Sequence, residues 1–423
     1  MEAVSQSIRV GAFRVDRHRG ARGIWGAATG IFLCLLSSLV VAAGAENAPR
    51  KAEVGAAEPV LPSAVAETQA ADVETPVSAA STIQQREEVE QAVDKALKWL
   101  ATQQRKDGSF ESIQVGQPGV TGLCVMAYLS RGHIPGEGPY GKRLEEGIAY
   151  VISCQHPDGL LCAVPYDFAG NYPMRHAALY NHGIAGLTLG EVYGMTDPSK
   201  SKRIRPVIKK AVAFSRQWQF RLKRNRKDVG GWRYLRNFGP SDSDLSVTAW
   251  QLMFYRSVKN AGFEIPTEYV NDAVAYVTRC FDEKQKLFVY GLFKKDRKIS
   301  RAMTGAGILS LSMAGRHNTK MVRQAGQWVL EQSFEEYNGG AVGLIDRYHY
   351  SAYYCSQAMF QLGGEYWARF YPPLVKTLLE HQREDGSWDP EINRDTMFGN
   401  AYTTSLAVLA LTPPYQLLPI SQR

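Results

Sequence analysis

Residues 95–110 read KALKWLATQQRKDGSF, and the spacing inside this stretch decides the fold. Ala96 is followed three positions later by Trp99, then by Gln104, and then by a turn at Gly108. A pattern that recurs at long period marks copies of one structural unit. Units of roughly 50 to 65 residues hold two helices and their connections, so each unit is predicted to be one helical hairpin. The position of Trp99 recurs at Tyr150, Phe214, Tyr276, Trp328 and, without the aromatic ring, Thr377.

The two halves of each unit differ in where their apolar residues fall. In residues 89–104, Val89, Val93 and Leu97 recur at helical spacing while charged and amide side chains take the other face, which predicts a half-wet outer helix. The second half is apolar or small nearly all round, so it must be buried. These inner helices are expected at 119–129, 180–189, 246–255, 302–313, 351–362 and 401–411.

We therefore predict an all-α fold, an α/α toroid in which six helical hairpins form an inner and an outer ring of helices. An open solenoid is the alternative, but solenoids carry polar capping repeats at their ends. The terminal inner helices, around Cys124 and Leu406, are as apolar as the middle ones, which favours the closed ring.

The N-terminal part has a different composition. Several arginines precede an uncharged apolar run at residues 24–45, which predicts a signal peptide or signal anchor over residues 1–45. We expect export to the periplasm or beyond, or alternatively anchoring in the inner membrane by residues 24–45. An Ala-, Pro- and Glu-rich disordered linker is expected at 46–86, the toroid at 87–415 and a tail at 416–423.

The net charge of +8 does not point to nucleic acid. In the folded part it concentrates at residues 200–210 and 221–227, where few aromatic residues are interleaved, so solvated helix faces are expected. Membrane contact is expected only through the N-terminal segment, and the oligomeric state stays open. The five cysteines after Cys34 lack a CxxC pair and predict no zinc knuckle, although a Cys154–Cys162 bridge remains open.

The stretch at 95–110 and the stretch from Gln382 to Trp388 resemble the QW repeat of squalene and oxidosqualene cyclases, which prenyltransferase β subunits share in weaker form. The resemblance covers roughly residues 87–415 and implies membership of the terpenoid cyclase and protein prenyltransferase toroids. In physical terms, the glutamine amide serves backbone groups that helix ends leave unpaired, and the aromatic ring shields them from water. The repeat therefore identifies a scaffold and not a reaction.

The resemblance also implies a place for a catalytic acid. Class II cyclases protonate an alkene with the middle aspartate of a DxDD motif, and Asp242-Ser243-Asp244-Leu245 is the matching stretch. Asp244 takes the place of the acid and Asp242 the first position, while Leu245 replaces the final aspartate. The alternative is that these residues simply cap the helix that follows.

Prenyltransferases hold zinc with Asp, Cys and His, but their Asp-x-Cys pair is missing here. No cofactor is predicted, and zinc held by Asp346, His349, Cys355 and His182 stays only as an alternative.

Aromatic and hydrogen-bonding residues recur where inner helices begin, around the expected central cavity. They are candidates to bind an apolar, isoprenoid-like ligand, with core packing as the alternative. The candidates are Tyr180, His182, Trp250, His349, Tyr350, Tyr354 and Tyr402.

Two functions follow from these patterns. The altered acid motif slightly favours a noncatalytic exported binding or scaffold protein that displays its loops to a protein partner. The alternative is an isoprenoid-processing enzyme, cyclase- or prenyltransferase-like, that uses an apolar barrel cavity. An open apolar cavity beside Asp244 would favour the enzyme, and a filled barrel would favour the scaffold.

Overall fold

The computed structural model describes residues 76–164, 172–235 and 239–422. The expected signal or anchor at residues 1–45 and the first part of the expected linker lie outside these residues. The rest of the linker range is helical, because the first helix begins at Pro76 and not near residue 87. Within the described ranges, no helix is both long and apolar enough to cross a membrane.

Twelve α-helices alternate between two roles in the part of the chain that the structure describes. The outer helices are α1 (Pro76–Thr102), α3 (Gly141–Ser153), α5 (Pro198–Gln219), α7 (Thr267–Arg279), α9 (Lys320–Leu330) and α11 (Gly364–Glu380). The inner helices are α2 (Gly119–Ser130), α4 (Tyr172–Tyr193), α6 (Leu245–Asn260), α8 (Arg301–Met313), α10 (Tyr348–Leu362) and α12 (Gly399–Leu411). Each inner helix contains the range that the sequence predicts for it.

Short elements occupy the connections and the C-terminal tail. Strands β1 (Phe281–Asp282) and β2 (Leu287–Phe288) form an antiparallel pair between α7 and α8. The 3-10 helices are η1 (Gln114–Gly116), η2 (Arg226–Asp228), η3 (Arg394–Phe398), η4 (Pro413–Tyr415) and η5 (Pro419–Ser421).

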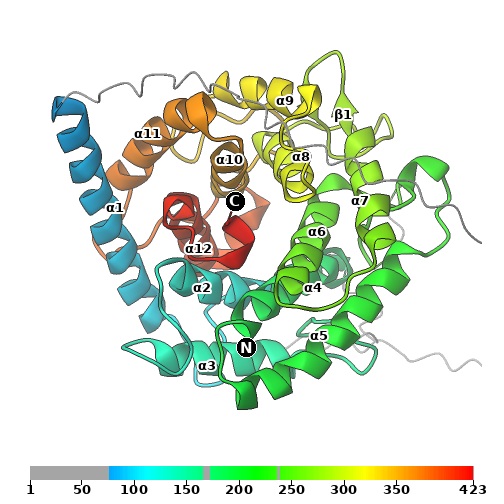
Figure 1. Ribbon diagram of the computed structural model, residues 1–423, viewed down its shortest axis with the longest axis horizontal. Coiled ribbons are helices and arrows are strands. Elements are labelled where there is room, and N and C mark those ends of the chain that lie inside the picture. The colour runs from blue at the N-terminus through cyan, green and yellow to red at the C-terminus, as the bar shows by residue number, and fades with distance from the viewer. Residues whose placement is uncertain (1–75, 165–171, 236–238, 423) are drawn as a thin grey trace, which may run out of the picture. The chain divides into compact units, whose positions relative to one another are not determined.

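The inner helices of the unit formed by residues 72–423 make a closed ring (Figure 1). Each packs against the next in chain order, from α2 through α4, α6, α8 and α10 to α12, and α12 packs back against α2. Every residue of α2 is buried, whereas α3 alternates buried and exposed positions, as the two apolar patterns predict. Outer helix α1 contacts both α11 and α12, so the last hairpin meets the first.

The glutamine repeat forms the joints between neighbouring hairpins. At the closing joint, Nε2 of Gln382 donates to the carbonyl of Gly386 at 2.9 Å and to that of Ala92 in α1 at 2.8 Å. The carbonyl of a turn and the carbonyl of the next outer helix thereby share one amide group. Three further joints repeat this arrangement, from Gln104 to Gly108 and Arg143, from Gln155 to Gly159 and Val207, and from Gln219 to Gly230 and Tyr269.

The glycine of each of these turns is required by its backbone and its surroundings. Gly386 has a φ of +96°, and a Cβ atom there would lie 2.6 Å from the carbonyl oxygen of Lys95. The following aromatic residue, Trp388, is fully buried and donates its indole N–H to the carbonyl of Leu378 at 2.8 Å. The repeat is therefore a structural device that lets adjacent hairpins approach closely.

Cysteine chemistry does not hold this ring together. All five cysteines in the described ranges are free, so the Cys154–Cys162 bridge that the sequence leaves open is not formed.

Candidate functional site

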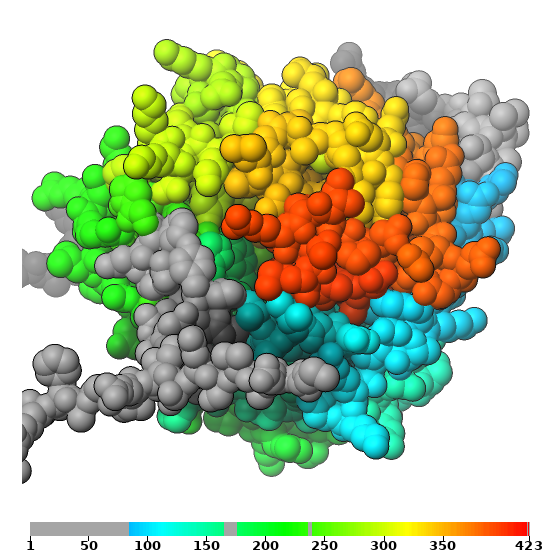
Figure 2. Space-filling model, turned by 180° about the vertical axis from the view of Figure 1, so that it is seen from behind, coloured from blue at the N-terminus to red at the C-terminus, as the bar shows by residue number. Residues whose placement is uncertain are grey.

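All inner helices begin at the same end of the ring, because each is entered from an outer helix through a connection of similar design. We call this end the mouth, and Figure 2 shows it, with the connection between α11 and α12 in orange-red near the middle. Helix N-termini carry partial positive charge, so the mouth favours acidic side chains. The described parts of its connections are residues 103–118, 154–164, 220–235, 239–244, 280–300, 331–347 and 381–398.

Asp244, the predicted acid, is the N-cap residue of α6. Its Oδ1 accepts the backbone N–H of Val247 at 2.8 Å. Its Oδ2 lies 3.9 Å from Nε of Arg233, and the Tyr290 hydroxyl also interacts with the carboxyl group and acts to lower its pKa. Complete burial raises the pKa of this carboxyl group to about 6, although the Arg233 guanidinium acts in the opposite direction. The geometry is therefore compatible with both predicted roles, helix cap and acid.

Arg233 places one positive charge between two buried carboxyl groups. Its Nη2 lies 3.4 Å from Oδ1 of Asp296, and Oδ2 of Asp296 accepts the hydroxyl of Ser241 at 2.5 Å. Two carboxylates beside one guanidinium carry excess negative charge, which is costly in a buried site. The cluster therefore favours keeping a proton on one carboxyl group, and burial raises the pKa of Asp244.

Neutral tyrosine hydroxyls lie beside these charges. The hydroxyls of Tyr234 and Tyr290 are hydrogen-bonded to each other, and burial raises the pKa of both, so they stay protonated at neutral pH. The ring of His176 in α4 stacks on Tyr234 with centroids 3.6 Å apart. The ring of Tyr180, one turn further along α4, lies 6.4 Å from that of Tyr234. We call Asp244, Arg233, Asp296, Tyr234 and Tyr290 the Asp244 cluster. Tyr180, a predicted ligand residue, lies beside this cluster.

Other predicted ligand residues form a packed aromatic layer below the mouth. The ring of Trp250 stacks on Tyr353 with centroids 5.5 Å apart, and Tyr354 packs edge-on against Trp250. Trp250 and Tyr354 are completely buried. Tyr350 is less buried, and its hydroxyl accepts the indole N–H of Trp250 at 2.8 Å and bonds Oγ of Ser246 at 2.9 Å. Tyr350 thus links the aromatic layer to the first turn of α6.

A second carboxyl group caps α10 from the neighbouring connection. Glu391 is buried and accepts the backbone N–H groups of Tyr348 at 3.0 Å and His349 at 2.8 Å. Burial lowers the pKa of His349 to about 3, so its ring stays neutral and packs against Tyr348. Tyr402, on α12, is also buried, and Asp395 and Glu391 are among its electrostatic neighbours. The structure thus gives His349 a packing position and places Tyr402 at the mouth.

His182 has a structural role. It is fully buried, and its Nδ1 accepts the backbone N–H of Leu161, which follows a glycine turn, at 3.1 Å. Burial lowers the pKa of His182 to about 4, which keeps the imidazole neutral and able to accept. In three other hairpins a threonine hydroxyl accepts the equivalent N–H, namely Thr121 for Phe110, Thr248 for Trp232 and Thr404 for Trp388.

Asp242 makes its hydrogen bonds with residues outside the Asp244 cluster. Its carboxylate binds the guanidinium of Arg224 through both oxygens, at 2.6 and 3.1 Å, and also accepts the backbone N–H of that residue at 2.7 Å. Desolvation raises the pKa of Asp242, but the bonds from Arg224 outweigh it and hold the pKa below its usual value. Its own backbone N–H donates to Oδ2 of Asp228 at 2.7 Å. Asp242 therefore anchors residues 220–230, which is a different task from the predicted catalytic one.

The alternative zinc site does not form. Asp346 accepts Nε of the buried Arg301 at 2.7 Å, and Sγ of Cys355 lies 3.3 Å from the carbonyl oxygen of Arg301. In the described ranges, no three His, Cys, Asp or Glu side chains are grouped so as to hold a metal ion.

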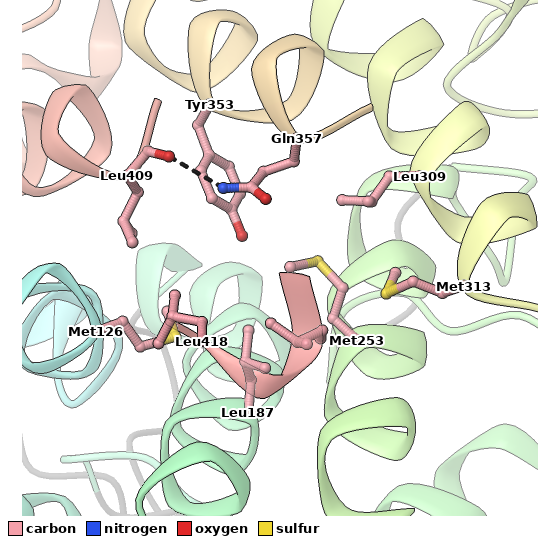
Figure 3. Close-up of a pocket in the computed structure, with 10 residues that line it drawn as sticks. Met126, Leu187, Met253, Leu309, Met313, Tyr353, Gln357, Leu409 and Leu418 are labelled. Carbon is pink, nitrogen blue, oxygen red and sulfur yellow. Dashed lines mark hydrogen bonds between the residues drawn. The ribbon is translucent and has the colours of Figure 1, made fainter. Parts of the chain in front are cut away.

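A small cavity lies at the centre of the ring. It measures about 10 Å³, room for about one water molecule, lies at the axis of the ring and is lined from all six inner helices (Figure 3). Leu418 and Ile420 of the C-terminal tail also line it. Of the aromatic layer only Tyr353 reaches this cavity, and Asp244 does not. Its remaining lining residues are Met126, Leu187, Met253, Leu309, Met313, Gln357 and Leu409.

Sequence reasoning missed four members of the Asp244 cluster: Arg233, Tyr234, Tyr290 and Asp296. One signal was present, because Arg233 and Tyr234 directly follow the glycine turn and Trp232 in the hairpin that contains Asp244. Tyr290 and Asp296 come from the next hairpin, and no sequence spacing relates them to Asp244.

No protein-family model and no curated protein matches the chain. Solved structures do match over most of its length. Cellobiose 2-epimerase from Spirochaeta thermophila DSM 6192 aligns with a TM-score of 0.56 and 14% identity, covering 80% of this chain and 98% of that one. The chain is an α/α toroid.

Two further matches have other activities. A variant of the type II terpene cyclase MstE from Scytonema, in complex with geranylgeranyl dihydroxybenzoate, aligns with a TM-score of 0.51 and 14% identity, covering 79% of this chain and 99% of that one. An α-1,6-mannanase of Salegentibacter sp. HEL1_6 aligns with a TM-score of 0.51 and 9% identity, covering 77% and 98%. The toroid fold is thus shared by a cyclase, a glycoside hydrolase and an epimerase, and these identities establish the fold alone.

Proposed function

We propose that this toroid is an acid–base enzyme for an uncharged substrate of the isoprenoid class, with Asp244 as the proton donor. The observation that carries the proposal is the state of its carboxyl group, which is fully buried, lies beside Arg233 and the Tyr290 hydroxyl, and has a pKa raised to about 6. A carboxylic acid with a pKa near the working pH is well suited to transfer a proton. Arg233 would stabilise the carboxylate that remains.

The substrate class rests on the aromatic residues of the mouth and on one structural relative. Tyr180, Tyr350 and Tyr402 present rings whose π faces stabilise developing positive charge. The cyclase MstE, which shares the fold, is described with a geranylgeranyl substrate. Carbohydrates are the competing substrate class, because an epimerase and a mannanase share the fold as well.

A noncatalytic binding or scaffold function is the second candidate, and the small size of the axial cavity, which Asp244 does not line, favours it. The central cavity has room for about one water molecule, and Trp250 and Tyr354 are completely buried. A ring of this kind would present the connections of its mouth to a protein partner.

The test replaces Asp244 with asparagine, which keeps the N-cap acceptor for Val247 but cannot donate an acidic proton. The purified chain is incubated in D₂O with polyprenyl alcohols and geranylgeranylated phenols, and products are analysed by mass spectrometry. We expect the wild-type chain to form a product with one solvent deuterium and Asp244→Asn to lose at least a hundredfold in rate.

The matched control is Asp197→Asn, because Asp197 caps α5 in the same manner at an exposed position. It should retain full activity. Unchanged turnover by Asp244→Asn would remove the acid role, and conversion of oligosaccharides instead of isoprenoids would replace the substrate class. Retention of a ligand without any product would favour the noncatalytic candidate.

We also propose that the chain is exported, with residues 1–45 as signal peptide or anchor followed by a linker. The arginines and the apolar run at residues 24–45 support this proposal. N-terminal sequencing of the mature protein is expected to begin at Glu46 if the segment is cleaved. A chain recovered from the cytoplasm with residues 1–45 intact would contradict export.

A further inference from the structure

The connection between α5 and α6 carries exposed apolar side chains. Phe220 is 73% exposed, Leu222 99% and Val229 51%. Single exposed apolar residues are common on protein surfaces, but three within residues 220–230 form a concentrated patch. A completely exposed leucine gains free energy when another apolar phase covers it.

These side chains project from a loop that is fixed in place. Nζ of Lys223 donates to the carbonyl of Gly231 at 2.9 Å, and the guanidinium of Arg224 binds Asp242. From α7, Arg279 donates to the carbonyl groups of Lys227 and Val229. The exposure of Leu222 is therefore a property of an ordered loop.

Basic residues are interleaved with the apolar ones. Residues 220–230 contain five basic residues and one acidic residue. Lys223 and Arg224 are used internally, whereas Arg221, Arg226 and Lys227 are exposed and form no ion pair with any described residue. The patch thus combines apolar tips with unneutralised positive charge.

The neighbouring connection extends this charge along the mouth. Residues 291–298 contain four basic residues and one acidic residue, and Lys294, Lys295 and Lys298 are exposed. The two connections are joined by the Arg233–Asp296 ion pair. The next connection around the ring reverses the balance, since residues 331–347 contain four acidic residues and one basic residue.

We infer that this part of the mouth docks on the surface of an anionic lipid bilayer. We call it the rim, and it comprises Phe220, Leu222, Val229, Arg221, Arg226, Lys227, Lys294, Lys295 and Lys298. Leucine and phenylalanine enter the interface between headgroups and acyl chains, while flanking arginines and lysines attract anionic headgroups. A protruding tip surrounded by cations fits a bilayer better than a protein pocket, because it needs no partner of defined shape.

Membrane docking through the rim is a further property in addition to the proposed function, and it does not depend on any catalytic activity. It also adds a contact with the membrane to the one expected through the N-terminal segment. An acidic protein partner would use the charges of the rim but would not require two hydrocarbon tips to enter an apolar phase.

The first experiment sediments the full chain with vesicles of phosphatidylcholine alone or with phosphatidylglycerol. Because the apolar run at residues 24–45 can bind either kind of vesicle, we expect stronger binding to the anionic vesicles than to the neutral ones, and a smaller difference at high salt. The double variant Phe220→Ser/Leu222→Ser should bind about tenfold less tightly or worse, because it loses the burial of two apolar side chains. The matched control is Leu344→Ser, which removes a 94% exposed leucine from the acidic connection at residues 331–347.

A second measurement is independent of how the N-terminal segment contacts the vesicles. An environment-sensitive fluorophore on Leu222→Cys should shift its emission to the blue on anionic vesicles, and the same label on Leu344→Cys should not. Equal shifts at both positions, or none at position 222, would overturn the inference. So would a double variant that binds like the wild type with an unchanged thermal unfolding midpoint, or tight binding to an acidic protein with no fluorescence shift on lipid.

Discussion

Gly386 shows at the scale of a single residue how the ring is held together. Its φ of +96° and the carbonyl of Lys95 in α1 both exclude a side chain. We expect Gly386→Ala to lower the free energy of unfolding by about 3 kcal/mol or more, because a backbone clash adds to the conformational strain. Urea denaturation followed by circular dichroism measures the effect.

Gly138 provides the matched control for this substitution. It has a φ of +66°, but no atom lies within 4 Å of the place that a Cβ atom would take, so only the conformational strain remains. Gly138→Ala should cost about 1 kcal/mol. Equal losses for the two variants would show that the close approach to Lys95 contributes nothing to stability.

The residues of the joints were predictable, but most of the acid cluster was not. Gln104 and Gly108 recur with their neighbours in every clear copy of the repeat, and periodicity alone reveals them. Asp244 was found through a resemblance. Tyr290 and Asp296 have no periodic position, because they reach Asp244 only when two hairpins are packed side by side.

At the scale of an element, the C-terminal tail is tied to the ring by a titratable group. Glu191 of α4 is buried and accepts the hydroxyl of Ser257 at 2.5 Å and the backbone N–H of Ile420 at 3.1 Å. Burial raises its pKa from 4.5 to about 7. The folded chain therefore binds more protons than the unfolded chain between about pH 4.5 and 7, and stability is lost as the pH rises through this window.

We expect the folded chain to be more stable at pH 5 than at pH 8, with Glu191 contributing up to about 3 kcal/mol. Urea denaturation at the two pH values measures this difference. Glu191→Gln should remove the contribution of Glu191, and Glu283→Gln, at an exposed position, should retain it. The pKa of Asp244 is also raised, so the wild-type pH dependence contains both groups, and only the comparison with Glu191→Gln isolates the part due to Glu191. A pH dependence that Glu191→Gln leaves undiminished would contradict the assignment.

The sequence patterns predicted which segments are helices better than they predicted where each helix begins and ends. Helix α1 begins within the expected linker. Its first residues have few large apolar side chains, but they include alanines, and after Pro76 they contain no proline or glycine that would end a helix. The exposed loop at residues 220–230 was predicted only as a solvated charged stretch. The side chains of Phe220 and Leu222 are 73% and 99% exposed, and the composition of the loop does not reveal this exposure.

At the scale of the whole molecule, closure of the ring gives the joint between the last and first hairpins the same hydrogen bonds as a joint in the middle of the chain. Gln382 joins the last hairpin to the first, and Gln219 joins two hairpins in the middle of the chain, each through two carbonyl groups. We expect Gln382→Ala and Gln219→Ala to lower the free energy of unfolding by similar amounts, about 1–3 kcal/mol. In an open solenoid the terminal substitution would only increase fraying, so a markedly smaller effect of Gln382→Ala would contradict closure.

The architecture was predictable because six copies of one pattern specify six similar hairpins. Closure was only favoured by the apolar end helices, and the contact between α12 and α2 establishes it. Activity lies at a different level. Toroids with 9% to 14% identity to this chain include a hydrolase, a cyclase and an epimerase, so neither the fold nor its repeat specifies a reaction.

The C-terminal tail has a consequence for the order of assembly. Leu418 and Ile420 line one cavity together with side chains from all six inner helices, so this cavity is complete only when the sixth hairpin has closed against the first. Until then α2 and α12 lack the contact that each makes with the other. Docking of the tail is thus a late event that depends on a completed ring, and an incomplete chain exposes the kind of surface that chaperones recognise.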